Sequence, residues 1–191
     1  MPMINIQQFC LNPNDAEYLD ARIVRPFVVG GWQYGTDGKI IVRTPTTEPD
    51  TLPPVIISAF EGPKFRPESV FDRYFDPALG ADNPSCLPWP SDVLMVRKVL
   101  PCPNSQKDNF NVTVCHRHCP MCHGDAEFKQ DHRCMVGEHW IAAKYHSLID
   151  TLPDVKYIDV PAKNERGDFV PLPFIFDGGQ GLICGLNPKY F

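Results

Sequence analysis

The sequence has no apolar run long enough to cross a bilayer and no excess of basic residues. It also has no basic N-terminal region followed by an apolar core. Lys and Arg number 18 against 23 Asp and Glu, a formal charge of −5. Without an apolar run of about 18 residues, a transmembrane helix is excluded. The acidic balance argues against a broad surface for duplex DNA. Because the N-terminal residues lack a signal-peptide pattern, we expect a cytoplasmic protein with no membrane partner.

Composition also constrains the fold. Hydrophobic residues make up 43% and charged residues 21% of the 191 residues, which excludes wholesale disorder. Proline occurs 21 times, twice its usual share of ~5%. Each proline inside a helix costs ~3 kcal/mol, so a long helical bundle is excluded. The length predicts one domain or two small ones.

Cysteine and histidine crowd into one segment of the chain. All six histidines lie between residues 116 and 146, and four of the eight cysteines lie between 115 and 134. The string Cys119-Pro-Met-Cys122-His-Gly124 has the Cys-x2-Cys-x-Gly form of a zinc knuckle, in which two thiolates hold one tetrahedral ion and the glycine allows a sharp turn. In a cytoplasmic chain such a cluster indicates metal rather than disulfides. We therefore predict one structural zinc ion.

The knuckle leaves two ligand positions to be filled. Cys134, after eleven intervening residues, is the predicted third ligand. Thiolate and imidazole ligands favour zinc over magnesium or calcium. Four protein ligands would leave no position for water, which predicts a structural rather than a catalytic ion. Spacing leaves four candidates for the fourth ligand: His132, His139, Cys115 and Cys102.

The patterning of apolar residues predicts similar elements at the two ends of the chain. The N-terminal part predicts a strand over 4–7, a helix over 13–25, and strands over 27–36 and 39–44 around the hairpin dipeptide Asp37-Gly38. The C-terminal part predicts a strand over 93–100, a helix over 141–152, and strands over 155–160, 172–176 and 181–186. Between them, residues 45–90 are rich in proline, with a short strand at 55–57 and a short helix within 67–75.

This repeated order of strand, helix, strand, strand predicts an α+β fold. Two such units can join edge to edge and pack both helices on one face of the sheet. Residues 1–100 and 140–191 would form this domain, and residues 101–139 would form an inserted zinc module.

Two segments carry a family resemblance. Tyr34-Gly-Thr-Asp-Gly-Lys-Ile-Ile-Val-Arg43 resembles a segment of bacterial sliding-clamp domains, and residues 171–186 look like the final hairpin of such a domain. Together with the knuckle and the helix that follows it, the combination is similar to uncharacterised phage and prophage proteins. The resemblance implies a clamp-like antiparallel sheet with two helices, in a phage-encoded protein of the host cytoplasm. The chain is long enough for only one of the three domains of a clamp protomer, which does not support a full clamp function.

These features predict a non-enzymatic protein that binds a host or viral protein. It would be either an inhibitor of host defence, such as an anti-CRISPR protein, or a replication accessory; no small-molecule substrate is evident. One alternative is a metal-dependent His-Asn-His nuclease, based on Cys119 and Cys122 followed by Asp131-His132. The other is single-stranded nucleic-acid binding through Lys64-Phe-Arg66 and Arg73-Tyr-Phe75, although aromatic rings in such segments more simply cover the core.

Overall fold

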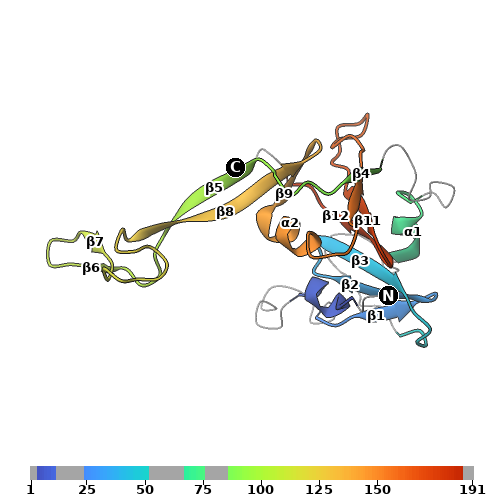
Figure 1. The fold of residues 1–191 in the computed structure, drawn as a ribbon, viewed down its shortest axis with the longest axis horizontal. Helices are drawn as coiled ribbons and strands as arrows, with labels where there is room; N and C mark the ends of the chain where they lie inside the picture. Colours follow the sequence, from blue (N-terminus) through green and yellow to red (C-terminus); the bar gives the residue numbers. More distant parts are fainter. Residues whose placement is uncertain (1–3, 12–23, 52–66, 76–85, 187–191) are drawn as a thin grey trace.

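An antiparallel sheet organises the body of the protein, and a long two-stranded arm projects from that body (Figure 1). The computed structural model describes residues 4–11, 24–51, 67–75 and 86–186, with the side chains of 128–131 excepted. Within these ranges the chain is mostly antiparallel strand with two α-helices, as the predicted α+β class requires. No helix of the described part has the length and apolar content needed to span a bilayer.

The main sheet has seven strands in the order β1-β2-β3-β12-β11-β10-β4, all paired antiparallel. Successive side chains of a strand point to opposite faces of the sheet, and here both faces are packed against a core. Their bounds are β1 (Phe27–Val29), β2 (Trp32–Thr36), β3 (Ile40–Pro45), β4 (Cys86–Pro88), β10 (Lys156–Ile158), β11 (Leu172–Phe176) and β12 (Gly179–Ile183).

The N-terminal and C-terminal strands meet where β3 pairs with β12. Ile41 lies opposite Leu182 in this ladder, and Arg43 lies opposite Gln180. The guanidinium of Arg43 donates two hydrogen bonds to Oε1 of Gln180, at 3.0 and 2.7 Å. The two halves are therefore joined edge to edge, by backbone and side-chain hydrogen bonds.

Both faces of the sheet are covered. On one face lie the 3₁₀-helix η1 (Ile6–Phe9) and the helix α2 (Ala143–Ile149), and on the other lies the short helix α1 (Pro67–Phe71). The first core contains Ile6, Phe9, Ile40, Val42, Trp89, Cys134, Val136, Ile141, Tyr145, Ile149, Leu152, Leu172, Phe174, Phe176 and Ile183. The second contains Phe27, Tyr34, Ile41, Phe71, Phe75, Ile158 and Leu182.

Two glycines in the sheet make this packing possible. A Cβ at Gly35 would lie 2.6 Å from the carbonyl oxygen of Ile6, so only glycine lets η1 approach β2 this closely. A Cβ at Gly181 would collide with the ring of Phe174, which lies across the neighbouring strand. Gly35 thus leaves room for η1 in the first core, and Gly181 leaves room for the Phe174 ring.

The turn at Asp37-Gly38 is tied to α2. Oδ1 of Asp37 accepts hydrogen bonds from the backbone N–H groups of Lys39 and Ile40, and its Oδ2 accepts one from the hydroxyl of Tyr145 at 2.5 Å. Burial and the Asp37 carboxylate raise the pKa of Tyr145, so the phenol stays protonated and keeps donating. This contact fixes α2 against the hairpin.

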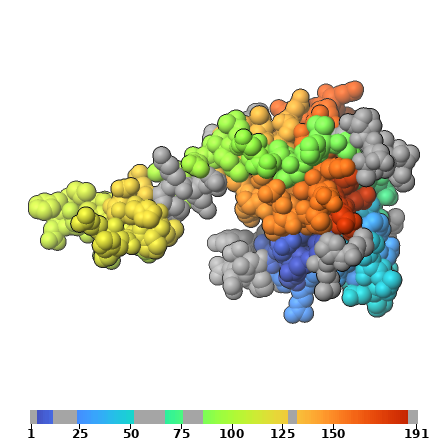
Figure 2. Space-filling view, viewed as in Figure 1, coloured from blue at the N-terminus to red at the C-terminus, as the bar shows by residue number. Residues whose placement is uncertain are grey.

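The arm is made by β5 (Met95–Pro101) and β8 (Glu127–Val136), which pair over their whole common length. At the body end, β9 (His139–Ala142) pairs with β8 and leads directly into α2. At the far end lies a small hairpin of β6 (Gln106–Lys107) and β7 (Thr113–Val114). Figure 2 shows this far end standing well away from the body.

Several predicted elements differ in the structure. The strand predicted over 4–7 is wrong: η1 forms because the side chain of Asn5 accepts a hydrogen bond from the N–H of Gln7 and because Ile6 and Phe9 are both buried. The strand predicted over 27–36 is two strands, since Gly30 and Gly31 adopt positive φ angles of 60° and 77° and turn the chain back.

The second half also departs from its prediction. The helix predicted over 141–152 begins only at Ala143, because residues 139–142 pair with β8. The strand predicted over 93–100 pairs with β8 in the arm and does not join the main sheet. The helix α2 packs on one face of the sheet, and α1, which falls within the short helix predicted over 67–75, packs on the other. The strand at 55–57 and most of the helix over 13–25 lie outside the described residues.

Candidate metal centre

Four cysteine sulfurs meet at the tip of the arm. Their Sγ atoms all lie within 4.8 Å of one another; Cys102 is 3.6 Å from Cys119 and 3.7 Å from Cys115. A tetrahedral ion with metal–sulfur bonds of ~2.3 Å separates its sulfur ligands by about 3.8 Å. None of these thiols forms a disulfide. The cluster of Cys102, Cys115, Cys119 and Cys122 is therefore close enough to hold one metal ion.

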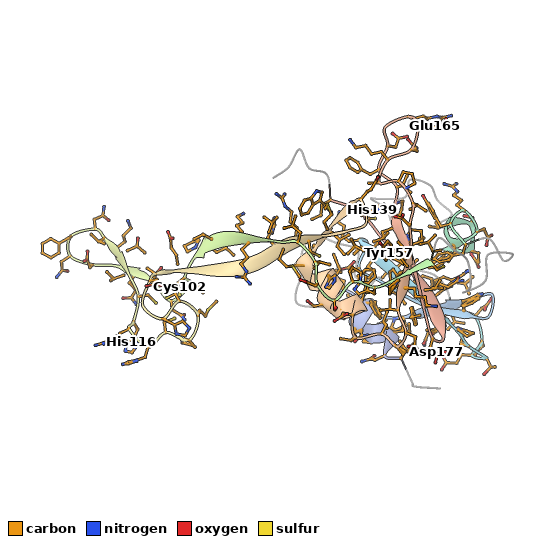
Figure 3. All side chains as sticks on the ribbon, turned by 45° about the horizontal axis from the view of Figure 1, so that its top comes forward. Cys102, His116, His139, Tyr157, Glu165 and Asp177 are labelled. Atoms are coloured by element: carbon orange, nitrogen blue, oxygen red, sulfur yellow. The ribbon has the colours of Figure 1, made fainter. Side chains whose placement is uncertain are left out.

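The ends of short strands bring the four thiols together. Cys102 follows β5 directly, and its N–H donates to the carbonyl of Ala126 just before β8 begins. Cys115 follows β7, which the β6–β7 hairpin returns to the same place. Figure 3 shows Cys102 and His116 in this part of the arm, far from the body.

The other two thiols come from the predicted knuckle. Its turn is closed by a hydrogen bond from the N–H of His123 to the carbonyl of Cys119, at 2.9 Å. Gly124 follows with φ of +102°, and a Cβ there would lie 3.3 Å from Cα of Arg117. Glycine is needed at this position because the backbone is left-handed and close to a neighbouring segment. The knuckle prediction thus describes the local backbone correctly.

The thiols differ in acidity. Backbone hydrogen bonds from Cys122 and Met121, and one from Nδ2 of Asn104 at 3.7 Å, lower the pKa of Cys119 to about 6. Burial and the neighbouring sulfurs raise the pKa of Cys115 to about 12. Burial also raises the pKa of Cys102. Four crowded sulfurs cannot all ionise without a cation, so this arrangement suits a bound metal ion.

The structure corrects the predicted ligand set. Cys119 and Cys122 are in the cluster, and Cys102 and Cys115, two of the four candidates for the last position, complete it. Cys134, the predicted third ligand, is fully buried in the first core and lies opposite Met95 in the arm ladder. The seven residue steps from Glu127 to Cys134, at ~3.3 Å each, place it about 23 Å from the tip end of that ladder.

The two histidine candidates also lie outside the cluster. His132 is exposed on β8, and His139 is buried where β9 begins at the body end of the arm. The predicted module over 101–139 thus contains all of β8, whereas the four clustered cysteines span residues 102–122. Cys102 and Cys115 each directly follow a strand, β5 and β7, and of these only the strand that becomes β5 was predicted from the sequence.

The alternative sites gain no support from these positions. A nuclease would pair a histidine with the ion, but the cluster consists of cysteines and His132 is elsewhere on β8. The aromatic ring of Phe75 is buried and stacks on Phe71 at 5.5 Å, so it covers the core instead of offering a platform for bases. Residues 64–66 lie outside the described residues.

An exposed turn beyond the cluster was missed by the sequence analysis. Between β6 and β7, Oδ1 of Asp108 accepts hydrogen bonds from the N–H groups of Phe110 and Val112, at 2.9 and 2.8 Å. Asn111 adopts a positive φ of 63° and its carbonyl accepts a hydrogen bond from Nζ of Lys107. This ordered turn holds the Phe110 ring 87% exposed. The sequence signal was Asp108-Asn-Phe-Asn111, a turn sequence with an aromatic residue at its centre.

No family model matches the chain, and neither a curated protein nor a solved structure gives a match. Function must therefore be inferred from the arm, its cysteine cluster and the body that carries them.

Proposed function

We propose that the cysteine cluster holds one structural zinc ion. Four thiolates at tetrahedral separations form the donor set of closed zinc sites, and they occupy every position of a four-coordinate ion. Such a set disfavours magnesium and calcium, which take oxygen ligands. A closed site leaves no position for water or substrate, which supports a structural and non-enzymatic role. The ion would join β5, β7 and the knuckle into one rigid tip.

The tip carries the features of a docking element for a protein partner. Phe110 is 87% exposed, and Val112, Val114 and Met121 are each more than 40% exposed on the same small hairpin and knuckle. A rigid aromatic anchor with apolar neighbours is typical of the energetic centre of a protein–protein interface. We infer that the protein is a non-enzymatic interaction protein that inserts this tip into an apolar pocket of its partner.

The charges at the tip favour a protein over nucleic acid. Lys107 and Arg117 are exposed there, but so are Asp125 and Glu127, and Asp108 lies in the turn itself. This mixture gives no basic stripe along which a phosphate backbone would lie. Nucleic acid is the second candidate because the turn that carries the exposed Phe110 ring also holds a cation: Nζ of Lys107 donates to the carbonyl of Asn111 at 3.1 Å, and stacking sites combine rings with cations.

The body supports the clamp-like part of the proposal. Two sets of antiparallel strands, β1–β3 and β10–β12, join edge to edge with α2 packed over one face. We propose that the body is a clamp-like scaffold of phage origin, acting as a host-defence inhibitor or a replication accessory in the host cytoplasm. Both roles need a projecting contact surface, which the arm supplies.

Photo-crosslinking from the tip tests the docking role. We expect a benzoyl-phenylalanine residue at position 110 to give one discrete protein adduct in cells that express the protein. The same residue at Leu94, which is 62% exposed just before the arm strand begins, is the matched control and should give no such adduct. The adduct should also disappear in a Cys122→Ser background. A protein partner at the tip would be contradicted by an adduct that forms only from position 94. It would also be contradicted by an adduct from position 110 whose mass falls after nuclease treatment.

The hydrogen bond from Asn104 predicts a pH effect on metal binding. Protons compete with zinc for thiolates, so zinc is released as the pH falls. Asn104→Ala removes a donor that lowers the pKa of Cys119, so the thiol should rise in pKa and release should occur at a higher pH. We expect the midpoint of release, followed with a zinc-sensitive dye, to move upward by a few tenths of a pH unit. Asn109→Ala, in the exposed turn, should leave the midpoint unchanged; equal midpoints for Asn104→Ala and wild type would refute this role.

A further inference from the structure

A pocket opens on the body, away from the arm tip. It lies between β9 and the loop that follows β10, and it has a volume of about 330 Å³. Figure 3 shows His139 beneath the loop that carries Glu165. This volume falls within the ~300–1,000 Å³ range of sites for small molecules. The residues of its lining that could recognise a ligand are Glu138, His139, Trp140, Lys163, Phe169 and Leu186.

One polar side chain in this lining lacks a partner. His139 is 1% exposed, and neither of its ring nitrogens has a partner at full hydrogen-bonding geometry among the described residues; the backbone of Val170 is near enough to act on the ring but does not satisfy it. A buried imidazole in this state is unfavourable, so a polar group from within the pocket is expected to complete it. Burial lowers the pKa of His139, opposed by the backbone of Val170 and the carboxylates of Glu138 and Asp159. The neutral ring offers one donor and one acceptor.

Aromatic rings and one cation complete the lining. Nζ of Lys163 lies 5.1 Å from the centre of the Phe169 ring, and the two residues are bridged through their backbones. The loop between them is ordered by Asn164, whose Oδ1 accepts hydrogen bonds from the N–H groups of Arg166 and Asp168. On the opposite wall, the N–H of Leu186 donates to the carbonyl of Trp140 at 2.6 Å. The walls of the pocket are therefore preformed.

We propose that this pocket binds a small aromatic carboxylate. A planar ring would pack against Trp140 and Phe169, while the ammonium of Lys163 would pair with the carboxylate and His139 would complete its own hydrogen bonding with the ligand. The carboxylate of Glu138 lies in the same lining and disfavours ligands that carry several negative charges. A singly charged aryl acid thus fits better than a nucleotide. The proposal does not depend on the zinc site or on the arm.

Titration of the full-length ¹⁵N-labelled protein with indole-3-acetate, followed by NMR, tests this proposal. Saturable amide shifts are expected only at residues 138–140, 162–163, 169 and 185–186, together with a change in the ring-nitrogen resonances of His139. Indole-3-ethanol has a similar ring and no charge, and it should bind at least about tenfold more weakly.

Two lysine variants make the test specific. Lys163→Met should weaken binding of the acid about tenfold and leave binding of the alcohol unchanged. Lys144→Met is the matched control, because Lys144 also lies over an aromatic ring, that of Tyr145 at 4.6 Å, but outside the pocket. Three binding results would overturn the proposal: no saturation at millimolar concentrations of the acid, equal affinity for the acid and the alcohol, or no effect of Lys163→Met. It would also be overturned if the ring-nitrogen resonances of His139 did not change on titration, because an ordered water would then be the partner of the ring.

Discussion

Replacing Cys122 with serine is expected to abolish stoichiometric zinc binding and to unfold the tip of the arm while the main sheet stays folded. Structural zinc contributes an apparent ~10–16 kcal/mol to the domains that it organises, and a closed four-cysteine site loses its geometry with one ligand. We expect the affinity for zinc to fall by more than the roughly 10–100-fold that follows loss of an outer-shell partner. Native mass spectrometry should show one zinc ion per wild-type chain and none in the variant.

The matched control is Cys134→Ala. Cys134 is fully buried in the first core and lies outside the cluster, so this variant should keep one zinc ion per chain although it is less stable. Zinc loss from Cys134→Ala, with retention in Cys122→Ser, would refute the ligand set drawn from the arm.

Hydrogen exchange separates the tip from the body in the same experiment. Chelation or Cys122→Ser should remove protection from residues 102–126, whose backbone hydrogen bonds hold the cluster together. The ladder between β3 and β12 should keep its protection, since its hydrogen bonds and the two cores around it do not involve the tip. A uniform loss of protection across the chain would show that the ion stabilises the whole fold and not the arm alone.

Phe174→Ala is expected to destabilise the body by about 3–5 kcal/mol, the usual cost of truncating a buried phenylalanine to alanine. Phe174 is fully buried, lies over Gly181, and contacts Trp89 edge to face with ring centres 6.0 Å apart. Its removal leaves a cavity in the first core, which α2 and η1 share. This loss is a large fraction of the total stability of a small domain, so the midpoint of urea unfolding should fall sharply.

Phe110→Ala is the matched control for that measurement. The ring of Phe110 is 87% exposed, so its removal should change the free energy of unfolding by less than about 0.5 kcal/mol. If both variants unfold at the same urea concentration, Phe174 does not occupy the core position described. A large loss of stability in Phe110→Ala would instead mean that its ring packs within the protein and is not free for a partner.

Local turn chemistry explains which parts of the fold could be predicted. The hairpin around Asp37-Gly38 was predicted correctly, because Gly38 takes the positive φ of 85° and the carboxylate of Asp37 accepts the N–H groups of the turn. The strand over 172–176 was predicted to the residue, since its apolar run ends at the turn Asp177-Gly178. In both cases the signals lie within a few residues of one another.

Long-range pairing explains which parts could not. The helix over 141–152 lost its first turn because β8 offers hydrogen bonds to residues 139–142, and β8 comes from the arm. One strand was predicted over 27–36, but β1 and β2 pair with each other because Gly30 and Gly31 turn the chain back with positive φ angles. These outcomes depend on which segments meet, and local propensity does not contain that information.

The α+β class, the knuckle at Cys119 and Cys122, and the concentration of metal-ligand residues in the middle of the chain could all be predicted from local patterns in the sequence. These features follow from spacing and turn residues within a few positions of one another. That Cys102 and Cys115, and not Cys134, complete the cluster follows from the packing of distant segments. The reason is geometric: β5 and β8 form an extended ladder that carries residues 102–126 away from the body, while β8 returns Cys134 to the core. Separation along an extended strand grows by ~3.3 Å per residue, so nearness in sequence did not make Cys134 a neighbour in space.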